Sequence, residues 1–137
     1  MPEIPRVLAS GKFDLLHPGH IFYLEECEKL YRKVELWVVI THENNIKDNL
    51  FTNEERKRML ESLEAVDGVL VGDKHVDFLA TIKKVEPDVI ALGHDQRPEG
   101  LEKSLENYKD EVKIERVKPY RSGKYSSTRF REMLKQH

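Results

Sequence analysis

Two histidines three residues apart, His17 and His20, lie in the segment GKFDLLHPGH, residues 11–20. The segment follows a short apolar run, and Gly11 at its start would let a ligand approach the backbone because it has no side chain. Pro18 suits the first position of a helix, since its missing N–H would be unpaired there. Such a helix would direct its positive dipole end and free backbone N–H groups at the strand end, with both histidines as donors to anionic oxygens. The segment therefore predicts a site for an anionic ligand at a strand-to-helix junction.

Competing interpretations of this segment are a different phosphate motif, a metal site and a structural pair of histidines. The spacing matches neither the dinucleotide motif G-x-G-x-x-G nor the P-loop G-x-x-x-x-G-K-[ST]. Zinc would need a third ligand, and the other histidines show no metal-type spacing: His42, His75, His94 and His137. Cys27 is the only cysteine, which leaves neither a disulfide nor a thiolate zinc cluster. A helix-capping histidine beside an exposed one is the ordinary explanation of such a pair, and the whole ten-residue string outweighs it.

The elements that must position this segment alternate along the chain. Apolar, β-branched runs predict strands at residues 6–10, 34–41, 68–72, 88–93 and 112–117. Helices are predicted at residues 17–33, 52–66, 76–87 and 126–137, the second opening with the capping-box pair Thr52 and Glu55. This alternation predicts an α/β fold, a single-domain doubly wound parallel sheet of five strands, Rossmann-like, over residues 1–137. The ligand of such a sheet sits at the carboxyl ends of the strands, where the strand order reverses. Residues 10–20, 93–97 and the turn before residue 126 are thus expected to form the site.

Length and composition limit the function. The chain has 137 residues, enough for one domain with its own core, and 39% of them are hydrophobic. The formal net charge of −2 argues against a general nucleic-acid binder, whose phosphate contacts need a basic surplus. The first residues resemble no signal peptide, and no stretch approaches 18 apolar residues, so we expect neither export nor a membrane span. A cytoplasmic protein that binds a small anionic molecule is the expectation.

Several segments resemble one enzyme family. Residues 11–20 resemble the signature G-T-F-D-L-L-H-x-G-H of the cytidylyltransferase family, one of the HIGH-motif nucleotidylyltransferases. RKRMLESLEAVDGVLVG is similar to the family's second helix and third strand, and DVIALGHDQ to its fourth strand and the following turn. RSGKYSST, residues 121–128, takes the place of the family's loop R-T-E-G-I-S-T-T. The resemblance implies an enzyme that joins a nucleoside triphosphate to a phosphate-bearing acceptor and releases pyrophosphate.

The resemblance also implies roles for individual residues. His17 and His20 would contact the α-phosphate region and stabilise the charge that develops there, and Lys47 would reach the phosphates as a third catalytic residue. The hydroxyl residues before the last predicted helix would bind the β- and γ-phosphates, helped by Arg121 and Lys124, and Asp95 would help to hold the nucleoside. The implied nucleotide-binding residues are Gly11, Lys12, Phe13, His17, Pro18, Gly19, His20, Gly93, Asp95, Arg121, Tyr125, Ser126, Ser127 and Thr128. Mg²⁺ would bridge the triphosphate oxygens, with no metal held by the chain itself.

Other residues have a structural interpretation beside the functional one. Lys47 is also explained as a solvated loop lysine, and Asp14 as an anchor that binds backbone N–H groups of its turn. The charge run EERKR, residues 54–58, indicates a solvated helix face, although Arg56 matches a family position near the nucleotide. Phe22 and Trp37 are expected in the core. Lys12 replaces the threonine usual in the family, and we expect it, with Arg97 and residues 96–107, near the acceptor.

The choice of substrates depends on two segments. LGHDQ and YSST are more similar to the archaeal FAD synthases of the family, which transfer AMP from ATP to FMN, than to its glycerol-3-phosphate cytidylyltransferases. ATP and FMN are therefore the expected substrates, with FAD and pyrophosphate as products and a homodimer as the expected assembly. The alternatives are a CTP-dependent glycerol-phosphate enzyme, a nucleotidyltransferase for another ADP or CDP precursor, and a nucleotide-binding module without catalysis. The presence of both histidines and of the hydroxyl cluster disfavours the last.

Overall fold

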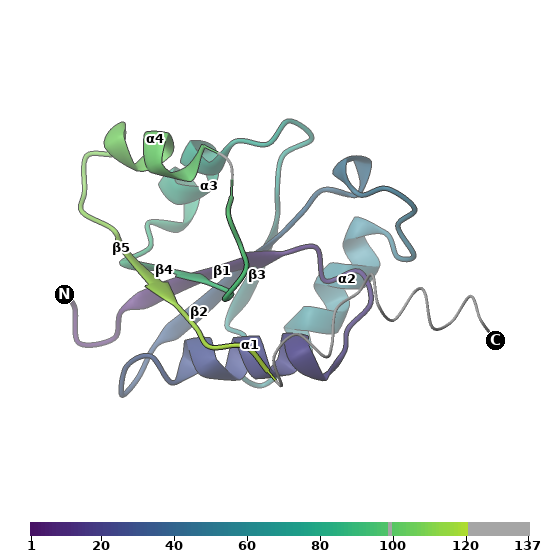
Figure 1. Ribbon diagram of the computed structural model, residues 1–137, viewed down its shortest axis with the longest axis horizontal. Coiled ribbons are helices and arrows are strands. Elements are labelled where there is room, and N and C mark those ends of the chain that lie inside the picture. The colour runs from purple at the N-terminus through teal and green to yellow at the C-terminus, as the bar shows by residue number, and fades with distance from the viewer. Residues whose placement is uncertain (99, 121–137) are drawn as a thin grey trace.

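A five-stranded parallel sheet forms the centre of the protein in the computed structural model, which describes residues 1–98 and 100–120. Its strands are β1 (Arg6–Gly11), β2 (Glu35–Ile40), β3 (Gly68–Val71), β4 (Val89–Leu92) and β5 (Lys113–Arg116). They pair in the order β3-β2-β1-β4-β5, and each pair is parallel. Figure 1 labels the strands in the centre of the protein. The chain builds outward from β1 in one direction and then in the other, so the strand order reverses between β1 and β4. The predicted five-stranded parallel sheet is confirmed.

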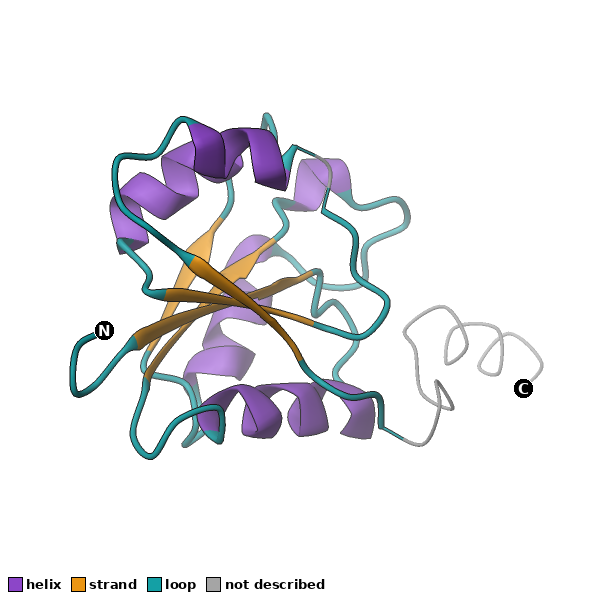
Figure 2. Ribbon diagram, turned by 60° about the vertical axis from the view of Figure 1, so that its left-hand side comes forward, coloured by secondary structure: helices purple, strands orange, loops and turns teal. Residues whose placement is uncertain are grey.

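Helices cover both faces of the sheet (Figure 2). They are α1 (Pro18–Glu28), α2 (Asn53–Glu61), α3 (Phe78–Val85) and α4 (Leu101–Glu106), with one 3-10 turn, η1 (Glu43–Asn45). Leu24 of α1 and Leu60 of α2 pack with alternate strand residues on one face, whereas Ile82 of α3 and Leu101 of α4 pack on the other. The strand sequences are almost continuously apolar because helices bury both faces of the sheet. The doubly wound arrangement predicted from the sequence is thereby confirmed.

Helix ends differ from the prediction in ways that local chemistry explains. The capping box is present, with Thr52 Oγ1 accepting from the Glu55 N–H at 3.2 Å and Glu55 Oε1 accepting from the Thr52 N–H at 3.0 Å. Helix α3 ends at Val85 because Glu86, which precedes Pro87, takes a left-handed conformation with φ of 52°. The helices predicted at 17–33 and 52–66 end earlier, at residues 28 and 61.

Two further differences concern whole elements. Helix α4 was not predicted, since its six residues are too few to show a helical repeat. The predicted helix at 126–137 lies outside the described residues. Among the described residues, no helix combines the length and the apolar character that crossing a membrane requires.

Candidate active site

A crevice opens where the strand order reverses, as expected for a sheet of this kind. Strands β1 and β4 pair only at Val7 with Val89 and at Leu8 with Ile90, and they separate toward their carboxyl ends. A cavity of about 270 Å³ lies there, which we call the histidine cavity. Its walls include predicted residues from the first motif and from the turn after β4: Gly11, Lys12, Phe13, His17, Gly19, His20, Gly93 and Asp95.

Other predicted residues lie elsewhere. Pro18 is exposed at the start of α1 and is not among the residues that line the histidine cavity. Lys47 is exposed on the segment after η1 and lines neither this cavity nor the second one described below, so its catalytic role stays a prediction. The predicted residues of the terminal loop lie outside the described residues: Arg121, Lys124, Tyr125, Ser126, Ser127 and Thr128. Their roles likewise stay predictions.

His17 both caps α1 and lines the cavity. Its Nδ1 accepts a hydrogen bond from the Gly19 N–H at 3.1 Å, and Pro18 takes the first helical position as expected. Because Nδ1 is an acceptor, the neutral ring carries its proton on Nε2. The N–H groups of His20 and Ile21 donate to the His17 carbonyl at 2.9 and 3.3 Å. The expectation of free backbone N–H groups at this helix end is therefore wrong for Gly19, His20 and Ile21.

His20 stacks on His17, with ring centroids 3.8 Å apart and an interplanar angle of 23°. Its other face lies against Phe13, at a centroid distance of 5.0 Å. Burial and the neighbouring His17 lower the pKa of His20 to about 3, while the Leu15 carbonyl opposes the shift. Burial lowers the pKa of His17 as well. Both rings are thus mostly neutral near pH 7 in this structure, and the single N–H of a neutral His20 ring is the donor that bonds to the Leu15 carbonyl.

The turn between β1 and α1 is held by two buried polar side chains. The carboxylate of Asp14 accepts from the N–H groups of Leu50 and Phe51 at 2.7 and 2.9 Å. Asp14 is therefore an anchor, as one interpretation held, and the N–H groups it binds belong to the distant segment before α2. Arg56 donates through Nη1 to the Lys12 carbonyl at 2.7 Å. Between these two contacts Phe13 adopts a φ of 47°, a conformation that non-glycine residues rarely take.

Glu54, Glu55 and Arg58 are exposed, as expected for a solvated helix face, and only Arg56 of residues 54–58 is buried. Its side chain has no exposed surface, and burial lowers its pKa, with Glu43 opposing. Its Nη2 donates to Asn53 Oδ1 at 2.7 Å, and the same oxygen accepts from the Glu43 N–H at 2.7 Å. The arginine thereby joins α2, η1 and the motif turn around the Lys12 carbonyl.

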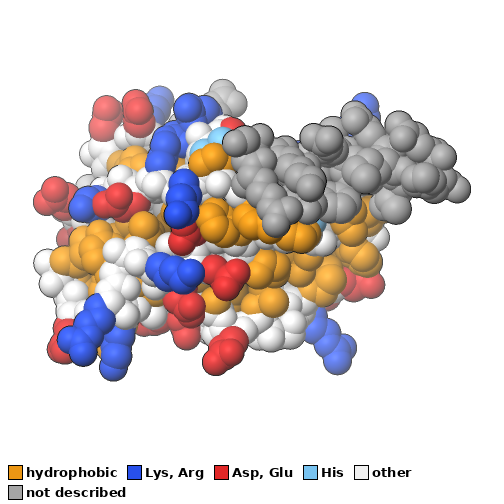
Figure 3. Space-filling view, turned by 60° about the horizontal axis from the view of Figure 1, so that its bottom comes forward, with side chains coloured by type: hydrophobic (Ala, Val, Ile, Leu, Met, Phe, Trp, Pro, Cys, Tyr) orange, Lys and Arg blue, Asp and Glu red, His pale blue; other side chains and the backbone are white. Residues whose placement is uncertain are grey.

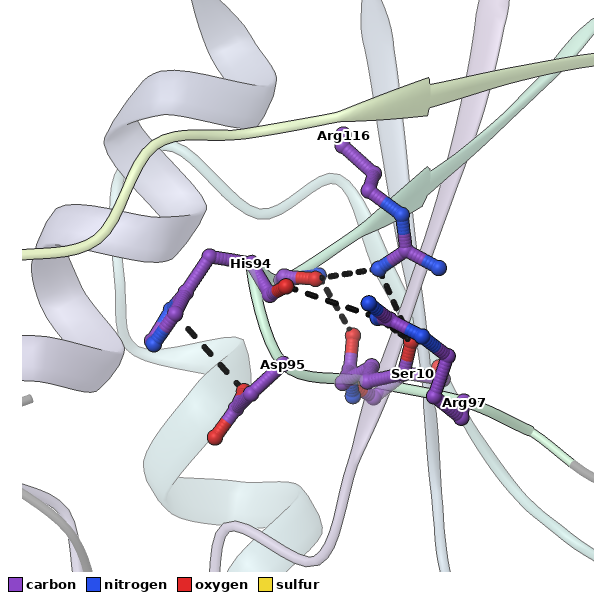
Figure 4. A network of polar contacts seen from close by, with 7 residues as sticks. Ser10, His94, Asp95, Arg97 and Arg116 are labelled. Atoms are coloured by element: carbon purple, nitrogen blue, oxygen red, sulfur yellow. Dashed lines mark hydrogen bonds and ion pairs between the residues drawn. The ribbon is translucent and has the colours of Figure 1, made fainter.

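Two arginines hold the turn after β4 (Figure 4). Arg116 of β5 donates through Nη1 to the carbonyls of Gly93 and Gln96 at 2.9 and 2.8 Å. Arg97 also donates to the Gln96 carbonyl, at 2.9 Å. The Asp95 carboxylate, 77% exposed, lies 3.9 Å from His94 Nδ1. The turn backbone is thus fixed while Asp95 stays accessible to a ligand.

A second cavity, of about 330 Å³, lies at the carboxyl ends of β1, β2 and β3. It shares a wall with the histidine cavity, formed by Ser10, Gly11, Lys12 and Gln96. Its far side is lined by the apolar side chains of Val76 and Phe78, with Asp73 and Asp77 beside them. Two ligands in these cavities would meet across the end of β1. Within the described residues no three histidine, cysteine or carboxylate side chains gather as a metal site.

Comparison with known proteins identifies the family. The model of the cytidylyltransferase-like family matches residues 8–133. The chain belongs to this family. FAD synthase of Methanocella arvoryzae is 35% identical to it over an alignment of 139 positions, which covers 97% of each protein. FAD synthase of Methanobrevibacter smithii is 34% identical over 130 residues, 90% of this chain and 85% of that protein.

A similar solved structure supports the fold. The crystal structure of the lipopolysaccharide core biosynthesis protein from Thermoplasma volcanium GSS1 matches with a TM-score of 0.76 at 36% sequence identity. The match covers 85% of this chain and 98% of that chain. The family resemblance inferred from the first motif is therefore confirmed, and the histidine cavity lies where the family signature ends a strand and begins a helix.

Sequence reasoning gave no individual role to several residues that line this cytidylyltransferase-like site, among them Phe22 and Tyr23, and it expected Gln96 only as part of residues 93–97. Phe22, expected in the core, lines the histidine cavity and contacts the Tyr120 ring at a centroid distance of 5.1 Å. Tyr23 and Gln96 also line it, although nothing in their spacing marks them. Tyr23 follows the motif by three residues and Gln96 ends LGHDQ, so adjacency to a recognised segment was the available signal. Trp37, the other expected core aromatic, is half-buried against the α3 face.

The lowered histidine pKa values predict how stability depends on pH. Since the unfolded histidines bind protons below about pH 6.5 and the folded ones do not, the free energy of unfolding should fall as the pH drops below 6.5. For His20, with a folded pKa of about 3, the loss at pH 5 is no more than about 2 kcal/mol. Urea unfolding at pH 7 and pH 5 measures this difference in the free energy of unfolding. His20→Phe should lose less stability than the parent over this interval, and an equal loss in both would contradict the assignment.

Proposed function

We propose that the protein is an FMN adenylyltransferase, which makes FAD and pyrophosphate from ATP and FMN. The observation that carries the proposal is the stacked pair His17 and His20 in a crevice at the strand-order reversal, in a chain whose relatives over most of its length are FAD synthases. A phosphate oxygen of FMN attacks the α-phosphorus of ATP and forms a new P–O bond. The bond from the α-phosphorus to the oxygen that bridges to the β-phosphate breaks, and pyrophosphate leaves.

The chain contributes positioning and charge stabilisation to this transfer. His17 and His20 would donate to oxygens on or beside the α-phosphate, where negative charge develops. Because burial lowers the pKa of both rings, the histidine pair brings little positive charge of its own to the site before a ligand binds. Lys12 and Lys118, which line the same cavity, supply positive charge. Lys47 and the hydroxyl groups of residues 126–128 remain part of the proposal from the sequence alone.

Mg²⁺ fits this site as a partner of the triphosphate. Among the described residues, two lysines and the exposed Asp95 are the acidic and basic side chains that line the histidine cavity, and these do not balance the charge of ATP. A divalent cation on the phosphate oxygens would neutralise that charge and stabilise the leaving pyrophosphate. The chain's own contribution is the donors that orient the same phosphates.

The second cavity is placed to take the acceptor. Its apolar far side, with Val76 and Phe78, suits the flat ring system of FMN, and its shared wall carries Lys12, which suits the phosphate end. Arg97 also lines this cavity, which supports the proposal that it lies near the acceptor. An acceptor lying this way would bring its phosphate over the end of β1 toward the α-phosphate in the histidine cavity.

The terminal hydroxyl residues give a prediction about ATP binding. Replacing Ser127 and Thr128 together by alanine should raise the KM for ATP about tenfold or more, because each lost hydrogen bond to a charged group costs about 1.5–3 kcal/mol. The KM for FMN should change little. Steady-state kinetics with each substrate varied in turn measures both values, and an unchanged KM for ATP would remove these residues from the triphosphate site.

The proposal includes that the protein forms a homodimer and works in the cytoplasm, where both ATP and FMN are present. Figure 3, in which the lower side of Figure 1 comes forward, shows hydrophobic side chains gathered in a band between acidic and basic ones. Leu63 and Ala65 are among the half-buried hydrophobic side chains that pack against the core cluster containing Leu24 of α1 and Leu60 of α2. Burial of such surface against a second copy would stabilise a dimer. On the described part of this face the two signs of charge are interspersed, which does not suit nucleic acid.

The test is product formation with defined substrate pairs. ATP or CTP is combined with FMN or glycerol 3-phosphate and Mg²⁺, and both pyrophosphate and the nucleotide product are measured, with a chelator as the control for the cation. FAD and pyrophosphate should appear only with ATP and FMN. Release with CTP and glycerol 3-phosphate would reassign the chain to the glycerol-phosphate enzymes. If no substrate pair gives product although ATP binding is measurable, the result would favour a nucleotide-binding module without catalysis.

A further inference from the structure

The two central strands part before they end. Strand β1 stays paired with β2 as far as Gly11 with Ile40, and β4 stays paired with β5 as far as Leu92 with Arg116. Between β1 and β4, pairing stops at Leu8 with Ile90. The facing edges beyond this point carry backbone N–H and C=O groups that no ladder bond satisfies, and such groups need partners when water is excluded.

Two side chains take the place of those ladder bonds. The Tyr23 hydroxyl, from α1, donates to the Ala91 carbonyl at 2.6 Å and accepts from the Ser10 N–H at 3.3 Å. Gln96, from the turn after β4, donates through Nε2 to the Ser10 carbonyl at 2.9 Å, and its Oε1 accepts from the Gly93 N–H at 2.7 Å. Each side chain therefore bonds to one edge of the split and to the other. The distance between the edges is fixed by side chains.

Both side chains are themselves held in place. Burial raises the pKa of Tyr23 well above its usual range, so the hydroxyl keeps the proton that it donates. The Tyr23 ring stacks on Phe13, with centroids 6.4 Å apart. The backbone of Gln96 is fixed by Arg97 and Arg116, whose guanidinium groups converge on the turn in Figure 4. Neither bridge is a loose surface contact.

We propose that Tyr23 and Gln96 are positioning residues that hold the crevice between β1 and β4 at the width that the transfer requires. The proposal rests on the proposed function, because it concerns the same site. Gln96 lines both the histidine cavity and the second cavity, so the side chain that bonds to Ser10 is also part of the wall between them. A change in the spacing of that wall would misalign the attacking oxygen and the α-phosphorus, and misplacement of about 1 Å costs up to about 10²-fold in rate.

The chemistry of the bridge explains why the residue is glutamine. The side chain must donate to one carbonyl and accept from one N–H at the same time, and an amide does both. An ionised glutamate of the same shape can accept from Gly93 but places a negative oxygen against the Ser10 carbonyl. A protonated glutamate donates again. The substitution Gln96→Glu therefore creates a bridge that acid restores.

The experiment compares Gln96→Glu with the parent from pH 8 to pH 5.5. At pH 8 turnover should fall about tenfold, and the ratio of variant to parent should rise as the pH falls. Asn107→Asp is the matched control, since it makes the same amide-to-acid change and also removes a donor from a carbonyl, that of Lys103, on the exposed end of α4. The control should keep the parent's turnover at each pH. A pH-dependent recovery confined to residue 96 is a readout that a loss of stability would not produce.

Two outcomes would overturn the proposal: turnover of Gln96→Glu within twofold of the parent at pH 8, or a loss that stays constant across the pH range. If this variant does not fold, Tyr23→Phe decides instead, because it keeps the ring against Phe13 and removes only the hydroxyl. Its turnover should fall at every pH, and an unchanged value would overturn the proposal.

ATP affinity separates this proposal from the proposed function. The dissociation constant of ATP with Mg²⁺ is measured by calorimetry for the parent and for Gln96→Glu at both ends of the pH range. A parent that makes no FAD refutes the proposed function alone. In that case the dissociation constant of Gln96→Glu divided by that of the parent still tests whether Gln96 holds the crevice. This ratio should be largest at pH 8 and should decrease toward pH 5.5.

Discussion

Replacing His20 by alanine is expected to lower the turnover of FAD synthesis by about 10²-fold or more, with the fold intact. The ring lies in the histidine cavity, stacked on His17 at 3.8 Å, and in the proposed reaction it donates to oxygens that gain charge in the transition state. Removal of one such donor typically costs about 10²–10³ in turnover. The KM for ATP should change much less, because the interaction strengthens only as charge develops. Single-turnover and steady-state rates of FAD formation measure the effect.

His17 needs a different substitution because it has two roles. Alanine would remove the helix cap together with the Nε2 donor, and the two losses could not be separated. Asparagine keeps a cap acceptor for the Gly19 N–H and removes the ring. The melting temperature of His17→Asn should therefore be close to that of the parent, while its turnover should still be about 10²-fold lower. His75, exposed and outside both cavities, gives the matched control in His75→Ala. Turnover of His20→Ala and His17→Asn within about threefold of that control would refute the role of the pair.

The sequence predicts the sheet and the place of the site because both depend on local patterns. Apolar runs of strand length alternate with helical segments, which specifies a parallel sheet before any contact is known. The string from Gly11 to His20 contains a strand end, a turn and a helix start in ten residues, so its geometry follows from neighbours in the chain. The structure has this strand end, turn and helix start where the sequence places them, whereas the roles of the residues in the string stay predictions.

What the sequence did not predict depends on contacts between distant segments. Arg56 belongs to a charge run that resembles a solvated helix face, and only the packing of α2 on the motif turn buries it. Gln96 and Ser10 meet across 86 positions of the chain. The second cavity is formed by the ends of three strands, so no single stretch of sequence indicates it. Asp14 was correctly suspected as an anchor, although its partners, Leu50 and Phe51, could not be foreseen from the turn alone.

Replacing Arg56 by methionine is expected to lower the free energy of unfolding by about 3 kcal/mol and to lower turnover as well. Methionine fills a similar space but leaves the Lys12 carbonyl without its donor, and hydrogen bonds to charged groups contribute about 1.5–3 kcal/mol each. The same carbonyl precedes Phe13, whose φ of 47° persists only while its surroundings enforce it. Urea unfolding gives the stability, and FAD formation well below the melting temperature gives the rate.

The same substitution two positions along α2 is the matched control. Arg58 is exposed on α2, so Arg58→Met should change stability by no more than about 0.5 kcal/mol and leave turnover as it is. The stability and turnover of Arg56→Lys should lie between those of Arg56→Met and Arg58→Met. Lysine restores a charge and one donor, but it cannot contact Lys12 and Asn53 with the spacing of the guanidinium fork. Equal effects of Arg56→Met and Arg58→Met would mean that the motif turn holds its shape without the arginine. A graded series would show that α2, which lines neither cavity, sets the geometry of the residues that do.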